Sequence, residues 1–300
     1  MLGIARDGSK AFSLGDVAAP IHPRSTNKLM QAAGMVSLGL DLTAEELALA
    51  AGSHWGQPKH VEAVREVLRR TGLDERALQC TEALPEDADA KRIAIEAGRP
   101  PAPIYHGCSG KHAAMLRTCS LNSWPLDRYL EPSHPLQQAL HGYLEATIES
   151  PTSHTAVDGC GAPAWAMPLT KLAGAYRDAV TADDRSSSLA QVADAMRAHP
   201  DYVCGDASEV TGLMRAVPGL LAKDGAESVY VAALPDGRAC AVKISDGGFR
   251  AGQAVLVEAL RVLGVADVPG VDVAALTRWG DVHLTGHGAG HGVVIQAHVH

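Results

Sequence analysis

The sequence predicts an α/β fold in which a mixed, mostly antiparallel sheet is flanked by helices. Two observations support this prediction. The segments that alternate like strands are joined by tight turns, as in antiparallel hairpins, and the helical segments between them show no regular βαβ alternation. The 300 residues are 46% hydrophobic and 20% charged, so the chain can bury a sizeable core. We therefore expect a single domain over residues 1–300.

Turn residues and apolar spacing place the individual elements. A hairpin over residues 3–15 is predicted by its Asp7-Gly8 turn, and a second over residues 229–244 by Pro235-Asp236-Gly237. Residues 81–103 are polar and rich in proline, which predicts surface structure. Helical spacing predicts helices over residues 26–40, 43–52 (opened by a Thr43–Glu46 capping box), 60–70, 136–148, 168–180, 188–199 and 252–263.

Charge and cysteine usage exclude several classes of protein. A net charge of −8 argues against a general nucleic-acid surface. No apolar run reaches membrane-spanning length, and the N-terminus lacks the apolar core of a signal peptide. The cysteines are spread too widely for a disulfide framework. We expect a cytoplasmic protein that does not act on membranes, with six reduced thiols: Cys80, Cys108, Cys119, Cys160, Cys204 and Cys240.

The segment Pro23–Lys28 is the first candidate for chemistry. It places the hydroxyl of Ser25 and the amine of Lys28 three residues apart, at the start of the helix expected over residues 26–40. On a helix these positions share a face. A serine becomes a nucleophile when a base takes its proton, and a lysine can be that base when burial lowers its pKa. The same residues also suit a helix cap and a solvated lysine.

Two cysteines lie in glycine-rich segments. Cys108 lies within Gly107–His112, and Cys160 lies within Asp158–Pro163. Two cysteines in such settings suggest one shared site, for a thiophilic metal or for catalysis. The alternative is that both are buried as small hydrophobic residues.

Three further positions are ambiguous in the sequence. Ser53 and His54 follow the end of a predicted helix, where a hydroxyl is commonly a turn residue. Lys243 lies in an otherwise apolar strand, where it either points to solvent or acts as a second base or cation. His287 and His291 have a metal-like spacing, but the glycines around them argue against a helix.

Taken together, these segments resemble a family of bacterial L-asparaginases, the Rhizobium etli type, also called class 3 or the asparaginase II family. The resemblance covers nearly the whole chain, and its motifs occur in the family's order. They are Pro-Arg-Ser-x-x-Lys at 23–28, Ser-His-x-Gly-x-Pro-x-His at 53–60, Cys-Ser-Gly-Lys-His at 108–112, Asp-Gly-Cys-Gly-x-Pro at 158–163, His-Pro-x-x-Val-x-Gly at 199–205, Lys-x-Gly-Ala-Glu at 223–227 and Val-Lys-x-x-Asp-Gly at 242–247.

The resemblance implies a fold like that of the serine β-lactamases and hydrolysis of L-asparagine to L-aspartate and ammonia. It implies two Ser-Lys pairs, Ser25 with Lys28 and Ser53 with Lys243, and a homodimer. It also implies a zinc ion, not strictly required for catalysis, near the substrate. By motif match the zinc ligands are Cys108, Lys111 and Cys160, and the substrate-binding residues are Arg24, His54, Asp158 and Gly161.

The chain departs from the family pattern in two places. The family usually carries an additional strand before the hairpin at residues 3–15, and its Cys-Gly-x-His block is here Cys80-Thr81-Glu82-Ala83. Two alternatives therefore stay open. One is a pseudoenzyme that binds zinc and asparagine without turnover. The other is a different Ser-x-x-Lys acyl hydrolase, acting on glutamine or on a β-lactam, although the Ser-x-Asn and Lys-Thr-Gly elements of β-lactam enzymes are missing.

Overall fold

A computed structural model describes residues 1–285, 292–295 and 297–298, in which twelve α-helices and an antiparallel sheet confirm a mixed α/β fold. His287 and His291 lie outside the described residues. The chain divides into two compact units. Unit 1 comprises residues 1–26, 167–181 and 209–300, and unit 2 comprises residues 27–166 and 182–208.

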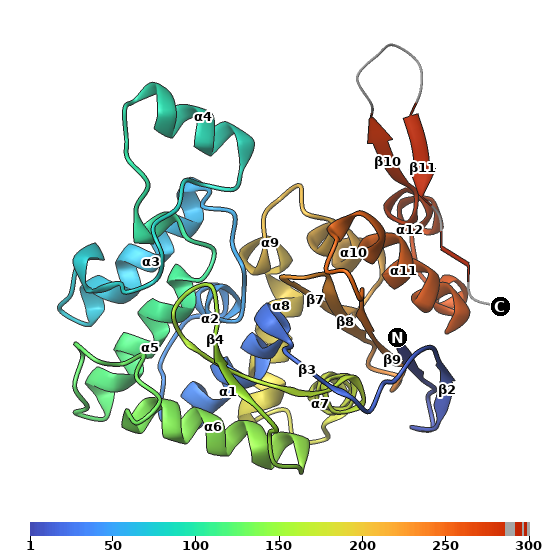
Figure 1. Ribbon diagram of the computed structural model, residues 1–300, viewed down its shortest axis with the longest axis horizontal. Helices are drawn as coiled ribbons and strands as arrows, with labels where there is room; N and C mark the ends of the chain where they lie inside the picture. The colour runs from blue at the N-terminus through green and yellow to red at the C-terminus, as the bar shows by residue number, and fades with distance from the viewer. Residues whose placement is uncertain (286–291, 296, 299–300) are drawn as a thin grey trace. The chain divides into compact units, whose positions relative to one another are not determined.

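Unit 1 is built on a five-stranded sheet in the order β2-β1-β9-β8-β7, in which all neighbours are antiparallel (Figure 1). Both predicted hairpins are confirmed, and the pairing of β1 with β9 joins the two hairpins in one sheet. The strands are β1 (Leu2–Ile4), β2 (Lys10–Ser13), β7 (Leu221–Gly225), β8 (Val229–Ala233) and β9 (Ala239–Lys243).

Helices cover both faces of this sheet. Helices α7 (Leu169–Thr181) and α11 (Phe249–Val262) both pack on β8 and β9. Every residue of β8 is buried, as expected for a central strand covered on two sides. The remaining elements of unit 1 are β3 (Pro20–Ile21), β6 (Met167–Pro168), α10 (Glu209–Ala216), α12 (Val273–Gly280), β10 (Val282–Thr285) and β11 (Gly292–Ile295).

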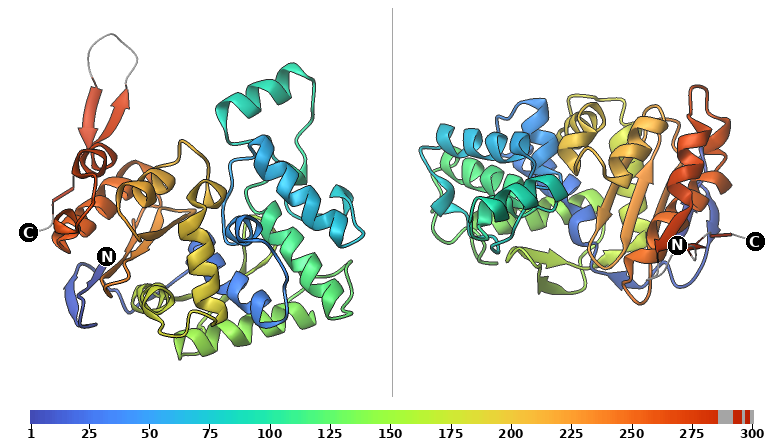
Figure 2. Two further views of the ribbon diagram at one scale, coloured as in Figure 1. Left: turned by 180° about the vertical axis from the view of Figure 1, so that it is seen from behind. Right: turned by 90° about the horizontal axis from the view of Figure 1, so that it is seen from above.

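Unit 2 is a helical assembly around α1 (Lys28–Ser37), which packs against α5, α6 and α8. Eight of the ten residues of α1 are buried, including Lys28 and Gln31, so this helix is enclosed on all sides. The other elements are α2 (Ala44–Ala50), α3 (Pro58–Arg70), α4 (Ala88–Glu96), α5 (Ser109–Leu121), α6 (Pro135–Ile148), β4 (Thr155–Val157), β5 (Pro163–Trp165), α8 (Ser188–Ala198) and α9 (Pro200–Val203). Figures 1 and 2 show α4 standing apart from the other helices of this unit.

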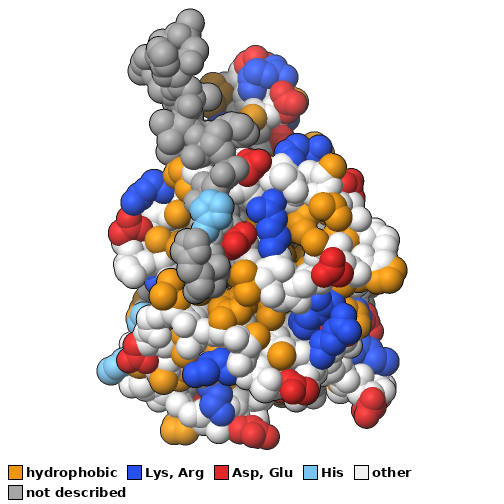
Figure 3. All heavy atoms as spheres, turned by 90° about the vertical axis from the view of Figure 1, so that its right-hand side faces the viewer, with side chains coloured by type: hydrophobic (Ala, Val, Ile, Leu, Met, Phe, Trp, Pro, Cys, Tyr) orange, Lys and Arg blue, Asp and Glu red, His pale blue; other side chains and the backbone are white. Residues whose placement is uncertain are grey.

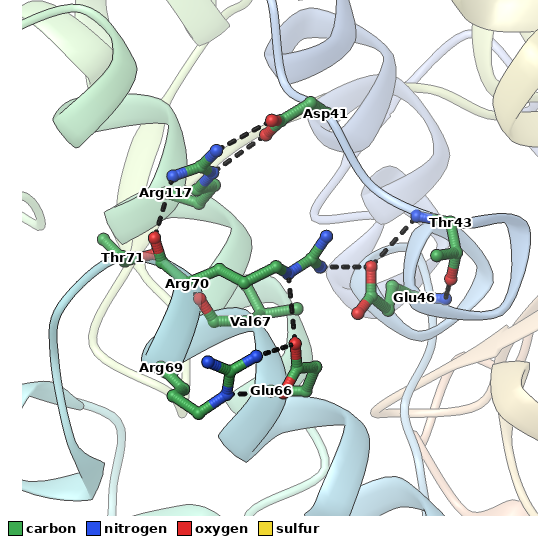
Figure 4. A network of polar contacts seen from close by, with 9 residues as sticks. All are labelled: Asp41, Thr43, Glu46, Glu66, Val67, Arg69, Arg70, Thr71 and Arg117. Atoms are coloured by element: carbon green, nitrogen blue, oxygen red, sulfur yellow. Dashed lines mark hydrogen bonds and ion pairs between the residues drawn. The ribbon is translucent and has the colours of Figure 1, made fainter.

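A polar network fixes the start of α2 (Figure 4). The capping box is confirmed, because Glu46 accepts from the amide of Thr43 at 2.9 Å while the Thr43 hydroxyl accepts from the amide of Glu46. The buried Glu46 carboxylate also pairs with Arg70 at the end of α3. Arg117 of α5 forms two hydrogen bonds to Asp41, at 2.8 and 2.7 Å, and a third to the carbonyl of Arg70. Three helices are thus joined at one point.

Several elements differ from the sequence prediction. The region 81–103 contains the unpredicted helix α4, and β7, α10 and α12 were not predicted. The helix expected over residues 26–40 is shorter. A 3₁₀ turn occupies Arg24–Asn27, and α1 begins only at Lys28. Ser25 and Lys28 therefore do not share one α-helix, which corrects that expectation.

On the face drawn in Figure 3, basic and acidic side chains are interspersed. Among the residues that the structure describes, no helix combines the length and the apolar character needed to cross a membrane.

Candidate functional site

In unit 1, the backbone that carries Ser25 is held by several contacts. The amide and the hydroxyl of Thr26 both donate to the carbonyl of Pro23, at 3.2 and 2.6 Å, and the Tyr176 hydroxyl donates to the carbonyl of Thr26 at 2.8 Å. Gly225 lies against this turn, since a Cβ there would be 3.2 Å from the amide nitrogen of Ser25. Ser25 itself is half-buried. The turn presents a serine on a backbone fixed by the end of β7 and by α7.

In unit 2, Lys28 is buried at the start of α1, with 1% of its surface exposed. Its Nζ contacts the carbonyl of Gly52, the Oγ of Ser53 at 3.1 Å and the carbonyl of Gly107 at 3.4 Å. The Nζ is the donor in all three contacts, and a charged ammonium group has three N–H groups to donate. To act as a base, Lys28 would first have to lose one of these protons.

His54 fixes the loop that carries Ser53. Its Nδ1 accepts from the amide of Gly56 at 3.1 Å, so in a neutral ring its Nε2 carries the hydrogen and donates to the Ser109 hydroxyl at 2.8 Å. Ser109 passes a hydrogen bond on to the carbonyl of Ile104. Burial, followed by the neighbouring His60, Lys28 and His106, holds the pKa of His54 well below its usual value. The ring is thus a neutral link between the Ser53 loop and the start of α5.

Cys108, Lys111 and Cys160 converge in unit 2, and the glycine-rich segments predicted this for the two cysteines. Cys108 precedes α5, and Lys111 lies in its first turn. Cys160 lies in the loop between β4 and β5, where Gly161 has a φ of +86° that favours glycine. The Nζ of Lys111 lies 3.3 Å from the Sγ of Cys160. All three side chains are buried, and Asp158 lies in the same loop.

The charges of this cluster depend on one another. A hydrogen bond from Cys108 lowers the pKa of Cys160; burial opposes this shift, and the charge of Lys111 adds to it. The same hydrogen bond, with burial, raises the pKa of Cys108 well above its usual value. Burial lowers the pKa of Lys111, but the negative charge of the Cys160 thiolate, supported by Asp158, outweighs this effect, so the net shift is upward. The arrangement is a Cys160 thiolate between a thiol and an ammonium group.

The cluster fits the thiophilic metal expected from the sequence. Two sulfurs and one nitrogen converge in a buried space, and this donor set suits zinc. In the described part of the chain, no group of three or more His, Cys, Asp or Glu side chains could hold a metal. The group nearest to the Cys160 sulfur besides Cys108 is the Lys111 amine, which would have to lose a proton before it could bind a metal.

In unit 1, Lys243 and Arg24 both contact Glu227. The Nζ of Lys243 donates to the carbonyl of Glu227 at 2.8 Å and to that of Ile244 at 2.7 Å. The guanidinium of Arg24 pairs with the Glu227 carboxylate at 2.5 Å. Lys243 is half-buried at the end of β9. Two expected site residues are thus linked through one residue that was assigned no role.

The structure brings together only some of the expected site residues. It joins Lys28 to Ser53, and it joins the two cysteines to Lys111. Each Ser-Lys pair implied by the resemblance has one member in each unit, so both pairs stay predictions. Sequence reasoning missed the carbonyls of Gly52 and Gly107, which carry no side-chain signal. It also missed Glu227, although the Lys-x-Gly-Ala-Glu motif contains it.

Comparison with known proteins identifies the family. A family model described as L-asparaginase II matches residues 1–295, nearly the whole chain. No match was found among curated proteins. The chain belongs to the L-asparaginase II family.

Proposed function

We propose that this L-asparaginase II family member hydrolyses L-asparagine to L-aspartate and ammonia with a Ser-Lys nucleophile. Family membership supports an amide hydrolase. The observation that supports Lys28 as the base is its buried amine, which contacts two carbonyls and the hydroxyl of Ser53, and Ser25 as nucleophile rests on the family motif. We also propose that the chain belongs to the Rhizobium etli type and shares the serine β-lactamase fold.

In the proposed reaction, the Oγ of Ser25 attacks the side-chain carboxamide carbon while Lys28 takes the hydroxyl proton. The C–N bond then breaks, the proton passes to the leaving nitrogen, and ammonia departs. Water hydrolyses the resulting aspartyl ester with the same base, which restores the free serine. Ser53, in hydrogen-bond contact with Lys28, would relay protons or orient the amine, and Lys243 would support this pair. General-base help of this kind contributes about 10²–10⁴ in rate.

The substrate carries a carboxylate and an ammonium group beside its amide. We propose that Arg24 pairs with the α-carboxylate, because a guanidinium matches a carboxylate with two parallel hydrogen bonds. Asp158 would accept from the α-ammonium, and Gly161 would let the substrate approach the backbone closely. His54 would contribute by holding the Ser53 loop, since both of its ring nitrogens are engaged by protein groups.

Cys108, Lys111 and Cys160 would hold a zinc ion near the substrate. Bound zinc would supply a positive charge that orients the substrate, without being strictly required. Cys108 and Lys111 must lose their protons to act as donors, whereas Cys160 is already a thiolate. Zinc binding should therefore release about two protons near neutral pH. Calorimetry in buffers of different ionisation enthalpy measures this number, and a release near zero would contradict the assignment.

The test of the proposed activity is ammonia release from L-asparagine and from L-glutamine. We expect wild-type protein to release ammonia from L-asparagine, faster at about pH 9 than at neutral pH because a neutral lysine is required. Ser25→Ala should abolish this release while leaving the fold intact by circular dichroism. A flat profile between neutral and alkaline pH would argue against a lysine base.

The same assay separates the alternatives. Faster release from L-glutamine would identify a glutaminase, because one methylene gives only modest discrimination. Zinc and asparagine binding without ammonia release would identify a pseudoenzyme, and labelling of Ser25 by penicillin would favour a β-lactam-directed enzyme.

The homodimer and the cytoplasmic location stay predictions. Light scattering coupled to size-exclusion chromatography tests the dimer.

A further inference from the structure

The turn between β7 and β8 has a backbone that its sequence does not favour. Glu227 has a φ of +60° and Ser228 a φ of +56°. Glycine, asparagine and aspartate are the usual residues at such positions in a hairpin turn, because a Cβ is disfavoured there. A non-glycine residue held in this conformation costs on the order of 1 kcal/mol. Two of them in succession indicate that surrounding contacts hold the turn.

Glu227 uses this conformation to contact two cationic side chains. Its carboxylate accepts from Arg24 at 2.5 Å, and its main-chain carbonyl accepts from Lys243 at 2.8 Å. Arg24 also has a positive φ, of +52°, immediately before Ser25. The strained residues of this region are therefore joined to each other and adjoin the proposed nucleophile.

We infer that Glu227 is a positioning residue that aims the Arg24 guanidinium at the α-carboxylate of the substrate, which rests on the proposed function. Stability does not account for the pair, because the Glu227 side chain is 57% exposed and exposed ion pairs contribute little. A glycine would suit the backbone of the turn better. What glutamate adds at this position is a carboxylate that fixes the direction of Arg24.

The experiment compares three variants with wild type. Glu227→Gln removes the charge and keeps the shape of the side chain, and Glu227→Gly removes the side chain while relieving the strain. Ser228→Gly is the matched control, since it relieves the same kind of strain in the same turn and keeps the Glu227 carboxylate. For each we would measure KM and kcat for L-asparagine, the Kd for L-aspartate by calorimetry, and Tm.

We expect both Glu227 variants to raise KM and the L-aspartate Kd about tenfold with kcat within about threefold, as for lost uniform binding. Glu227→Gly should keep or raise Tm, which a structural role would not allow. Ser228→Gly should raise Tm without changing KM.

Two results would overturn the inference. One is a KM and Kd within about twofold of wild type in both Glu227 variants, and the other is an equal rise in Ser228→Gly, which would assign the effect to the turn. Wild-type protein that binds L-aspartate without releasing ammonia would defeat the proposed function alone, and the Kd values would still decide on Glu227. Wild-type protein that neither binds L-aspartate nor releases ammonia would contradict both the proposed function and the role of Glu227.

Discussion

Lys28 and Lys243 are both expected to serve a Ser-Lys pair, yet the two units give them different surroundings. Lys28 is 1% exposed at the start of an enclosed helix, with its Nζ among two carbonyls and a serine hydroxyl. Lys243 is half-buried at the end of a strand, with its Nζ on the carbonyls of Glu227 and Ile244. Because burial disfavours the charged form of an amine, the deeper burial of Lys28 is the reason why we propose this lysine as the base.

The same contrast extends to how each unit holds its site residues. In unit 2, Lys28 and His54 are buried, and each of these side chains forms more than one hydrogen bond. In unit 1, Arg24 and Glu227 are partly exposed, and both have positive φ values. In unit 2, burial determines which charge state of a side chain is favoured. In unit 1, the positive φ values of Arg24 and Glu227 determine the directions of their side chains. We therefore expect changes at Lys28 and Glu46 in unit 2 to affect proton transfer and stability, and changes at Arg24 and Glu227 in unit 1 to affect substrate binding.

The largest difference should appear between Lys28→Met and Lys243→Met. Methionine keeps much of the side-chain volume and removes the amine. We expect Lys28→Met to lower kcat about 10²–10⁴-fold, the usual contribution of a general base, and Lys243→Met to lower it less. Steady-state assays with circular dichroism as the control for folding measure this. A reversed order would break the comparison.

Removing a glutamate side chain should destabilise the protein more in unit 2 than in unit 1. Glu46 is buried in unit 2, where it caps α2 and pairs with Arg70. Removing one member of a buried pair is strongly destabilising, so Glu46→Ala should lower the free energy of unfolding by about 2–3 kcal/mol, less than for a fully buried pair because Arg70 reaches solvent. Glu227→Ala, in an exposed pair, should cost less than about 1 kcal/mol. Urea denaturation gives both values, and equal losses would contradict the account.

Acidification should destabilise unit 2 through His60. Burial lowers the pKa of His60 from 6.5 to about 4. The unfolded state therefore binds more protons between these two values, and stability falls as the pH falls from about 6.5 towards 4. The loss attributable to His60 is on the order of 2–3 kcal/mol. Tm measured from pH 7.5 to 4.5 tests this prediction, and the dependence should be flatter in His60→Gln. An unchanged slope in that variant would remove His60 as the cause.

Local signals predicted the elements that depend on them. The Thr43–Glu46 capping box predicted α2, and the Pro235-Asp236-Gly237 turn predicted the hairpin of β8 and β9. β7 was missed because it carries Lys223 and Asp224. Lys223 is buried in the folded chain, where its Nζ donates to the Asp224 carboxylate at 2.6 Å. The pairing with Asp224 compensates the buried charge of Lys223. The strand is therefore buried although its sequence lacks the apolar pattern that would predict it.

The site was predictable where unusual residues mark it. Glycines around Cys108 and Cys160 predicted one cluster, and the structure joins these cysteines to Lys111. The contact of Lys28 with Ser53 was not predictable from local spacing. It depends on tertiary packing and on the main-chain carbonyls of Gly52 and Gly107, which every residue type possesses.

The most direct test of the central claim is to trap the covalent intermediate. Protein quenched in acid during turnover of L-asparagine would be digested and mapped by mass spectrometry, with Ser25→Ala and Ser53→Ala in parallel. The account predicts an aspartyl ester on the peptide that contains Ser25, absent from Ser25→Ala and present in Ser53→Ala. An ester on the peptide that contains Ser53, or turnover that continues in Ser25→Ala, would contradict it.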